Sequence, residues 1–311
     1  MQVFVAGGTG VLGHPTVRAL VAAGHRVRAT ARGTEKADRV LRFGAEPVDV
    51  ELYDGDTIGR AIAGSDAVLR LTTKIPQTLM KMRSAAAWRE TNRLRTVGAR
   101  VLVDAASAEH VPIYIHESVV FAYADGGDRW LGEDAPIDDG GTEILRSALQ
   151  GETHAARFSA AGGRGIVLRF GAFYGPDVPS TIETIAMARR RMLPRIGLGT
   201  NYMSSIFVPD AASAVVAALE APAGIYNVSD DHPVTFADYL RLLTEAVRAP
   251  RPWHVPAILG PILAGVAWNY LGRSQRVSNA RLKAVSRWTP VMKDVADGWP
   301  FVASRLAVTV T

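Results

Sequence analysis

Apolar runs and segments with helical periodicity alternate along the first 230 residues. The apolar runs predict strands at 2–6, 26–31, 46–50, 66–72, 112–118, 165–170 and 224–228. The helical segments between them lie at 12–23, 34–43, 54–63, 86–109, 143–161 and 210–220. This alternation predicts an α/β fold with a doubly wound parallel sheet. Because several strands are almost continuously apolar, we expect helices on both faces of the sheet.

The first predicted strand runs directly into a glycine-spaced turn that begins the first helix. Strand, tight turn and helix in this order place backbone N–H groups where a diphosphate binds. An ordinary βα turn is the alternative, but the preceding strand, the following helix and the helix stop at Gly24 favour a Rossmann-like dinucleotide site. The residues predicted to line it are Gly7, Thr9, Gly10, Val11, Leu12 and Gly13.

The chain divides into a regular and an irregular part, and its 311 residues suggest about two domains. Residues 1–170 and 205–230 carry the alternating pattern, and we predict that they form the dinucleotide-binding domain. Residues 171–204 and 231–311 are richer in proline and tryptophan and lack the alternation. We predict that these two segments form a smaller, discontinuous substrate-binding cap.

Composition narrows the range of functions. The net charge of +5 comes from scattered basic residues, so we expect no nucleic-acid partner. The one basic cluster, Arg189 to Arg191, is better explained as a solvated helix end than as a phosphate site. The absence of cysteine excludes disulfides and thiolate chemistry and fits a cytoplasmic protein. The histidines show no metal-site spacing, and we expect no metal.

The longest apolar stretch, 255–271, is interrupted by prolines and glycines and is too short to span a bilayer. We predict a buried or interface helix there, with a membrane-surface anchor as the alternative, and no stable membrane insertion. The amino terminus has no positively charged segment before the first strand, so we expect no secretory signal.

Several motifs together resemble the extended short-chain dehydrogenases/reductases of the NAD(P)-dependent epimerase/dehydratase type. They are the glycine turn at 7–13, Asp49-Val50, Leu71-Thr72-Thr73, the segment 168–176, the segment 207–214 and Tyr226-Asn227-Val228. They follow the family's order over about residues 1–230. The resemblance implies a small-molecule substrate, and it implies a possible homodimer formed through the helices at 86–109 and 143–161.

The resemblance also implies contacts with the cofactor. Asp49 and Val50 would contact the adenine, and Leu71, Thr72 and Thr73 would pass beside the nicotinamide ribose. The loop after the sixth strand would line the nicotinamide through Phe170, Gly171, Ala172 and Phe173. As an alternative from the residues alone, Asp49 could simply end a strand.

The choice between NAD and NADP can be argued at the end of the second strand. An NAD enzyme places an acid there to bind the ribose 2′-hydroxyl, whereas an NADP enzyme needs a cation for the 2′-phosphate. This chain has no acid at that position, and Arg32 follows the strand. A guanidinium binds a phosphate through two hydrogen bonds, so we predict NADP, with NAD the less favoured cofactor.

The resemblance breaks at the catalytic pair. The family uses Tyr-x-x-x-Lys with an upstream Ser or Thr, whereas residues 130–160 contain no tyrosine and no lysine. Aligned on Glu152, the pair would fall on Ile144 and Ala148. Ser118 matches the upstream residue, and Tyr123, on the loop beyond the fifth strand, is the predicted substitute because related epimerases carry a tyrosine near this position.

These observations leave three hypotheses open. The first is an atypical NADP(H)-dependent enzyme that reduces, epimerises, dehydrates or isomerises a small organic molecule, with Ser118 and Tyr123 as catalytic residues. The second is a non-catalytic NADP-binding sensor or regulatory protein, favoured by the missing pair. The third is a non-redox enzyme that uses the same pocket.

Overall fold

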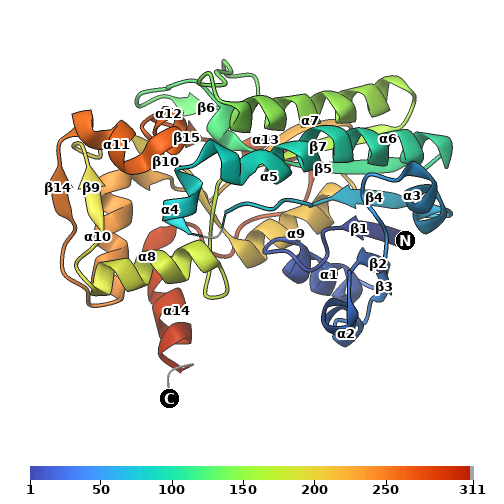
Figure 1. Cartoon of the computed structure of the whole chain (residues 1–311), viewed down its shortest axis with the longest axis horizontal. Coiled ribbons are helices and arrows are strands. Elements are labelled where there is room, and N and C mark those ends of the chain that lie inside the picture. Colours follow the sequence, from blue (N-terminus) through green and yellow to red (C-terminus); the bar gives the residue numbers. More distant parts are fainter. Residues whose placement is uncertain (77, 309–311) are drawn as a thin grey trace.

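A seven-stranded parallel sheet forms the centre of the computed structural model, which describes residues 1–76 and 78–308 (Figure 1). Its strands are β1 (Gln2–Ala6), β2 (Arg26–Thr30), β3 (Glu46–Val48), β4 (Ala67–Arg70), β5 (Ile113–Val119), β7 (Arg164–Phe170) and β12 (Gly224–Val228). Their order across the sheet is β12-β7-β5-β4-β1-β2-β3. All seven predicted strands are present, and the predicted fold class is confirmed.

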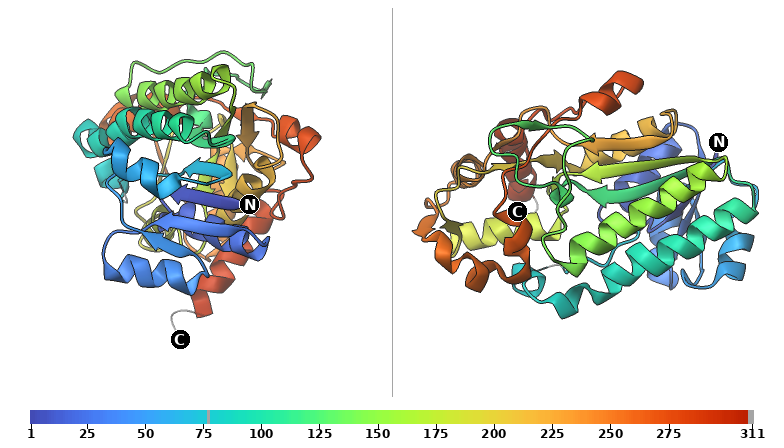
Figure 2. Two further views of the ribbon diagram at one scale, coloured as in Figure 1. Left: turned by 90° about the vertical axis from the view of Figure 1, so that its right-hand side faces the viewer. Right: turned by 90° about the horizontal axis from the view of Figure 1, so that it is seen from above.

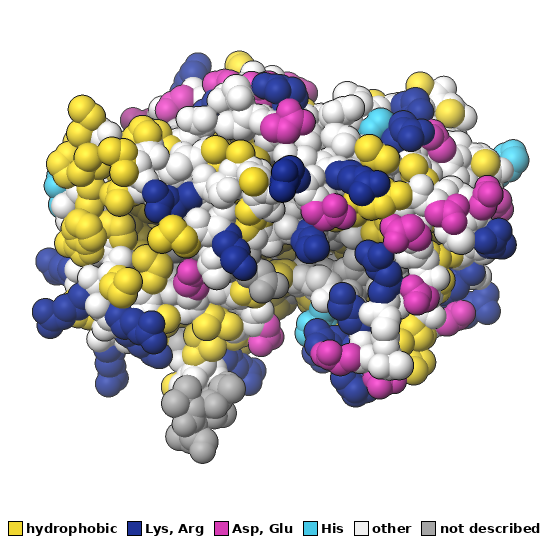
Figure 3. Space-filling model, in the orientation of Figure 1, with side chains coloured by type: hydrophobic (Ala, Val, Ile, Leu, Met, Phe, Trp, Pro, Cys, Tyr) yellow, Lys and Arg dark blue, Asp and Glu magenta, His cyan; other side chains and the backbone are white. Residues whose placement is uncertain are grey.

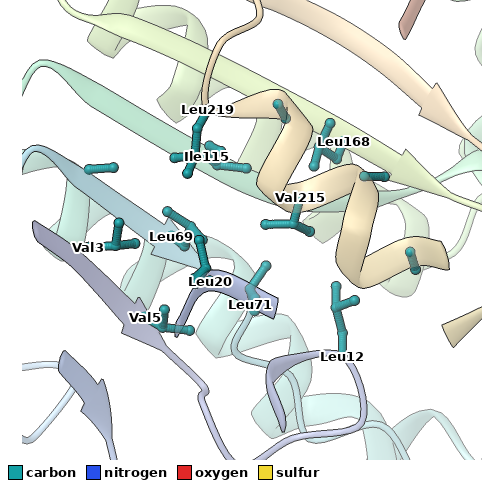
Figure 4. Close-up of a cluster of buried hydrophobic side chains, with 14 of the residues drawn as sticks. Val3, Val5, Leu12, Leu20, Leu69, Leu71, Ile115, Leu168, Val215 and Leu219 are labelled. Carbon is teal, nitrogen blue, oxygen red and sulfur yellow. The ribbon is translucent and has the colours of Figure 1, made fainter. Parts of the chain in front are cut away.

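Helices cover both faces of this sheet (Figure 2). One face carries α1 (Gly13–Ala22), α2 (Thr34–Arg42) and α9 (Val208–Ala218). The other carries α3 (Gly55–Ile62), α6 (Ala99–Ala108) and α7 (Glu143–Ala160). Successive side chains of a strand point to opposite faces, so Val3 and Val5 pack under α1 and α9 (Figure 4), whereas Phe4 packs on the opposite side. Both faces are therefore apolar, as the continuous strand pattern predicted.

The predicted helix at 86–109 is a run of helical pieces with an irregularity in its middle. A 3₁₀ turn (Ala85–Trp88) leads into α5 (Arg89–Arg93), a π-helical turn (Leu94–Gly98) follows, and α6 continues to Ala108. A π turn inserts one residue into an α-helix and is frequently found at functional sites. Here it is adjacent to the carboxyl ends of the central strands, where it contributes Arg95 to a buried cluster described below.

The irregular part of the chain forms a second apolar cluster beyond the carboxyl ends of the strands. It is built by α8 (Pro179–Arg189), α10 (Phe236–Ala246) and α14 (Val295–Val308), with Leu243 and Trp299 fully buried between them. The remaining elements are α4 (Leu79–Met82), β6 (Trp130–Leu131), β8 (Ala172–Tyr174), β9 (Pro194–Ile196), β10 (Tyr202–Met203), β11 (Ser205–Phe207), β13 (Val234–Thr235), β14 (Trp253–Val255), α11 (Gly260–Ala264), α12 (Trp268–Leu271), β15 (Arg276–Val277) and α13 (Ala280–Val285). The domain boundaries stay a prediction.

The apolar stretch at 255–271 is not the single buried helix predicted. It breaks into 3₁₀ turns, α11 and α12, because prolines cannot continue a helix and Gly265 has a φ of 57°. Ile258, in the 3₁₀ turn before α11, and Ile262, in α11, are 84% and 65% exposed. Figure 3 shows hydrophobic side chains gathered on this side of the molecule, over α11 and β14. Among the described residues, no helix has the length and apolar character needed to cross a membrane.

Candidate functional site

The glycine turn between β1 and α1 is held by close backbone contacts that exclude side chains. Gly7 has a φ of 97°, and a Cβ there would lie 2.8 Å from the carbonyl oxygen of Leu71 at the end of β4. A Cβ at Gly13 would lie 1.9 Å from the carbonyl oxygen of Gly7. Glycine is therefore required at both positions for α1 to begin directly against the end of β1.

The same turn leaves backbone donors free at the start of α1. Within the described residues, the N–H groups of Val11 and Leu12 make no hydrogen bond, and no acidic side chain lies in the first helical turn. The Gly7 N–H instead donates to Thr30 Oγ1 at the end of β2 (2.8 Å), which fixes the turn to the neighbouring strand. Free N–H groups and the positive end of the helix dipole suit a diphosphate.

The residues predicted to contact the adenosine lie at the adjacent strand ends. Arg32 follows β2 and forms an ion pair with Glu51 (2.9 Å), in which the two side chains are 60% and 50% exposed. Asp49 is exposed and Val50 is buried. The structure thus places Arg32 within reach of solvent, but it also places an acid beside it that the sequence reading missed.

The two nicotinamide segments also lie at strand ends. Leu71 is buried against the glycine turn, and Thr72 accepts a hydrogen bond on its carbonyl oxygen from the Arg70 guanidinium (2.7 Å). In the loop between β7 and β8, a Cβ at Gly171 would lie 2.8 Å from the Ser204 carbonyl oxygen. Phe170 and Phe173 pack on each other with ring centroids 5.4 Å apart. The cofactor roles of these segments stay predictions.

A buried polar network, which we call the balanced cluster, links the two predicted catalytic residues. Ser118 and Asn227 are each in register with Arg169 across β5, β7 and β12. Glu152 of α7 accepts hydrogen bonds from Ser118 Oγ (2.6 Å), Arg169 Nε (2.8 Å) and Arg169 Nη2 (2.6 Å). Arg169 Nη1 donates to Tyr123 Oη (2.9 Å), which in turn donates to Asn227 Oδ1 (2.8 Å).

The sequence predicted Tyr123 as a catalytic substitute on the loop beyond the fifth strand, and the structure buries its side chain within this network. Tyr123 and Ser118 are both 0% exposed, and both hydroxyl groups are occupied by neighbouring side chains. Burial raises the pKa of the Tyr123 phenol, and the charge of Arg169 opposes that shift. The charge of Arg169 is itself matched by Glu152 through two hydrogen bonds. Ser118 and Tyr123 are linked through Glu152 and Arg169, and their catalytic role stays a prediction.

A second buried group, which we call the unbalanced cluster, lies on the neighbouring strands β4 and β5. Arg70 is in register with His116 and forms an ion pair with Glu117 (3.3 Å). Arg95, from the π turn, is 1% exposed and donates to the Ile144 carbonyl oxygen (3.2 Å). Among the described residues, the Nε atoms of Arg70 and Arg95 and the Nε2 atom of His116 have no hydrogen-bond partner. The cluster therefore contains two guanidinium groups and one carboxylate, and Glu117 forms its ion pair with Arg70.

Electrostatics at this cluster follow from burial. Burial, with Arg70 and Arg95 adding to it, holds the pKa of His116 well below its ordinary value, so this imidazole is neutral near pH 7. Burial also lowers the pKa of Arg95, and Glu117 opposes that shift. Orphaned buried donors are costly, so each one calls for a specific explanation, such as a catalytic role or a bound water or ion. A polar ligand that reaches these donors would offset the excess positive charge.

The helix face that should carry the missing pair is filled with apolar side chains. Ile144 and Ala148 are 4% and 1% exposed. The first turn of α7 is capped by Thr142, whose Oγ1 accepts from the Leu145 N–H (3.3 Å). Arg95 is bonded to this same turn. The described residues contain no group of three or more side chains suited to hold a metal ion.

Sequence reasoning missed most members of both clusters. It used Glu152 only to set the register of α7, and Arg169 and Asn227 only as parts of motifs. A signal was present, because three consecutive polar residues, His116, Glu117 and Ser118, interrupt the apolar pattern at the end of β5. A polar residue on the buried side of a strand end needs a partner, and the partners lie on neighbouring strands and helices.

Comparison with known proteins identifies the class. The sequence model of the NAD dependent epimerase/dehydratase family matches residues 3–229. A 3-diazoavenalumate denitrifying reductase from a Streptomyces species is 32% identical over 96% of this chain and 99% of its own length. The chain belongs to the NAD dependent epimerase/dehydratase family, as the motifs predicted.

Two further matches, one to a sequence and one to a solved structure, are consistent with this family and its fold. A 4-hydroxy-2-methyl-3-oxo-4-farnesyl-3,4-dihydroquinoline-1-oxide ketoreductase from Stigmatella aurantiaca is 28% identical over 79% of this chain and 73% of its own. The crystal structure of a UDP-glucose 4-epimerase from Thermotoga maritima superposes with a TM-score of 0.82 at 18% identity, covering 100% of both chains. The predicted class of an NAD(P)-dependent oxidoreductase or epimerase-like enzyme is confirmed.

Proposed function

We propose that this protein is an NADPH-dependent reductase of a small organic molecule. The observation that carries the cofactor choice is the end of β2, where Arg32 stands and no acid ends the strand. The direction of the reaction is supported by two relatives that are named reductases. When bound, NADPH supplies a hydride to the substrate.

Residues of this chain are suited to hold both the adenosine diphosphate end and the nicotinamide end of such a cofactor. The free N–H groups at Val11 and Leu12 would hold the diphosphate, and Arg32 would bind the 2′-phosphate after leaving Glu51. The loop from Phe170 to Phe173 would lie against the nicotinamide. The Arg70 guanidinium, whose Nε is one of the orphaned donors, is a further sign of fit, because its Nη2 donates to the Thr72 carbonyl oxygen at the end of β4.

Cofactor choice is tested by titrating NADPH and NADH against three proteins. We expect the wild type to prefer NADPH and Arg32→Ala to lose about tenfold in NADPH affinity, since a charge-assisted contact is lost. Glu51→Gln removes the competing acid, so its NADPH affinity should rise while its NADH affinity stays the same. Equal affinities of the wild type for the two cofactors would contradict the assignment of Arg32.

Reductase activity is tested with phenanthrenequinone and a panel of aryl ketones, by following the loss of dihydronicotinamide absorbance. The expected result is turnover with NADPH that falls in Arg32→Ala through a higher KM for NADPH. Tight NADPH binding without turnover of any probe would favour a non-catalytic binding protein, and the reductase proposal would fail.

Ser118 and Tyr123 are carried forward as candidate catalytic residues in this proposal. Their hydrogen bonds support a second role, in which the balanced cluster fixes the ends of β5, β7 and β12 beneath the reacting groups. The two roles differ in their consequences. A catalytic Tyr123 predicts a large loss of kcat in Tyr123→Phe, whereas a supporting Tyr123 predicts mainly a loss of stability.

A further inference from the structure

The first turn of α7, where the family's catalytic pair would begin, is flanked by two side chains from other parts of the chain. Arg95 comes from the π turn and donates to the Ile144 carbonyl oxygen (3.2 Å). Tyr270 comes from α12 and packs with Leu145 in one apolar cluster, its ring 5.5 Å from that of Phe121. A cation and a phenol are thus present at this turn, although α7 itself supplies neither.

Arg95 is a buried cation without a carboxylate of its own. It forms no ion pair with the described residues, and Glu117, the acid whose charge acts on it, is already paired with Arg70. Its Nε has no partner. A buried unpaired charge costs stability. Arg95 is therefore a candidate functional residue, since a role in binding or catalysis would explain why the charge is present.

Tyr270 is 7% exposed, and its phenol makes no hydrogen bond to another described residue. Burial raises the pKa of the phenol to about 12, and Arg95 is the charged group that opposes the shift. Phe121 and Leu145, which pack beside it, carry no charge. The phenol is therefore protonated near pH 7, which suits a proton donor and the direction of reduction.

We propose that Tyr270 is the proton donor of this enzyme and that Arg95 is its positioning cation, together replacing the Tyr-x-x-x-Lys pair. The inference rests on the proposed reductase function. As a carbonyl carbon accepts the hydride, its C–O π electrons move to oxygen, the O–H bond of Tyr270 breaks, and the proton joins that oxygen. Water then restores the phenol. The Arg95 charge stabilises the tyrosinate that forms.

The test combines fluorine NMR with kinetics on the full chain carrying fluorotyrosine. The Tyr270 resonance is assigned by its loss in Tyr270→Phe, and the Tyr123 resonance by its loss in Tyr123→Phe. We expect NADP⁺ to shift the Tyr270 resonance. Arg95→Met should raise its alkaline titration midpoint by about one pH unit, and Arg95→Lys should restore it. Tyr123, whose cation is Arg169, is the matched control and should not respond to Arg95→Met.

In kinetics with NADPH and phenanthrenequinone, we expect Tyr270→Phe to lower kcat by about 100-fold or more, because a general acid contributes that much. Its NADPH affinity should stay within about threefold of wild type, since a lost hydroxyl that touches no dinucleotide phosphate changes binding little. With Tyr270 as the donor, Tyr123 supports the site, so Tyr123→Phe should lower kcat by less than about tenfold, and a larger loss than in Tyr270→Phe would overturn the proposal.

The proposal is overturned if the Tyr270 resonance responds neither to NADP⁺ nor to Arg95→Met, or if Tyr270→Phe keeps the wild-type kcat. Failure of the reductase function has a different signature. A wild type that binds NADP⁺ but reduces no probe contradicts the function, whereas the fluorine titration still decides whether the phenol lies beside Arg95 at the cofactor.

Discussion

The balanced and unbalanced clusters lie on neighbouring strands of one sheet and differ in whether their buried arginines are paired with carboxylates. In the balanced cluster, Arg169 meets Glu152 through two hydrogen bonds, and the hydroxyls of Ser118 and Tyr123 complete the set. In the unbalanced cluster, Glu117 pairs with Arg70, whereas Arg95 forms no ion pair with a described residue, and buried donors have no partner among the described residues. Both are equally shielded from water. Solvent access therefore does not explain the difference.

The comparison separates a group that stabilises the fold from a group arranged for a ligand. A satisfied buried ion pair is strongly coupled to its surroundings, so removing one partner leaves a charge that nothing compensates. An unsatisfied cation is already uncompensated, so its removal relieves the fold. Stability measurements on single variants can therefore assign each cluster its role without any knowledge of the substrate.

The largest effect is expected in the balanced cluster. Glu152→Gln should lower the free energy of unfolding by about 3–5 kcal/mol, because it strands Arg169 as a buried charge. Urea denaturation measures the change. Glu143→Gln is the matched control, since it removes an acid of the same helix from an exposed pair with Arg146, and it should cost less than about 1 kcal/mol. Equally small losses of unfolding free energy in Glu152→Gln and Glu143→Gln would contradict the proposed difference between the two clusters.

An intermediate effect, dependent on pH, is expected from His116 in the unbalanced cluster. Its pKa in the folded protein is held well below the value of about 6.5 that it has when unfolded. Below about pH 6.5 the unfolded chain therefore binds more protons, and stability falls as the pH falls, by up to about 1.4 kcal/mol per pH unit. His116→Asn should flatten this slope in urea denaturation between pH 6.5 and pH 5. A wild-type slope unchanged by the substitution would show that other groups cause it.

The smallest effect is expected at Arg95. Arg95→Met keeps the length of the side chain and removes an unpaired buried charge, so stability should change by less than about 1 kcal/mol or increase. Thermal and urea denaturation both measure it. The result sharpens the comparison most when the same preparation has lost reductase turnover. A loss of several kcal/mol would place Arg95 among the supporting residues instead.

Sequence reasoning recovered the sheet, its helices and the glycine turn because these follow from local periodicity and backbone geometry. The spacing of the glycines in the motif already indicates that side chains would not fit at Gly7 and Gly13. The clusters could not be recovered in this way. Arg169 and Glu152 meet only after β7 and α7 pack, and Tyr270 reaches the first turn of α7 from a segment whose helical form was itself predicted wrongly. Hydrogen bonds and contacts between residues far apart in the sequence produce no periodic pattern along the chain.

The exposed pair of Arg32 and Glu51 has a consequence for how binding responds to salt. Ions weaken both the pair and a contact between Arg32 and a phosphate, since neither is buried. Forming one contact requires losing the other, so their salt dependences partly cancel. NADPH affinity should consequently change less with ionic strength than it would at a lone arginine, which keeps cofactor loading steady when the surrounding electrolyte varies.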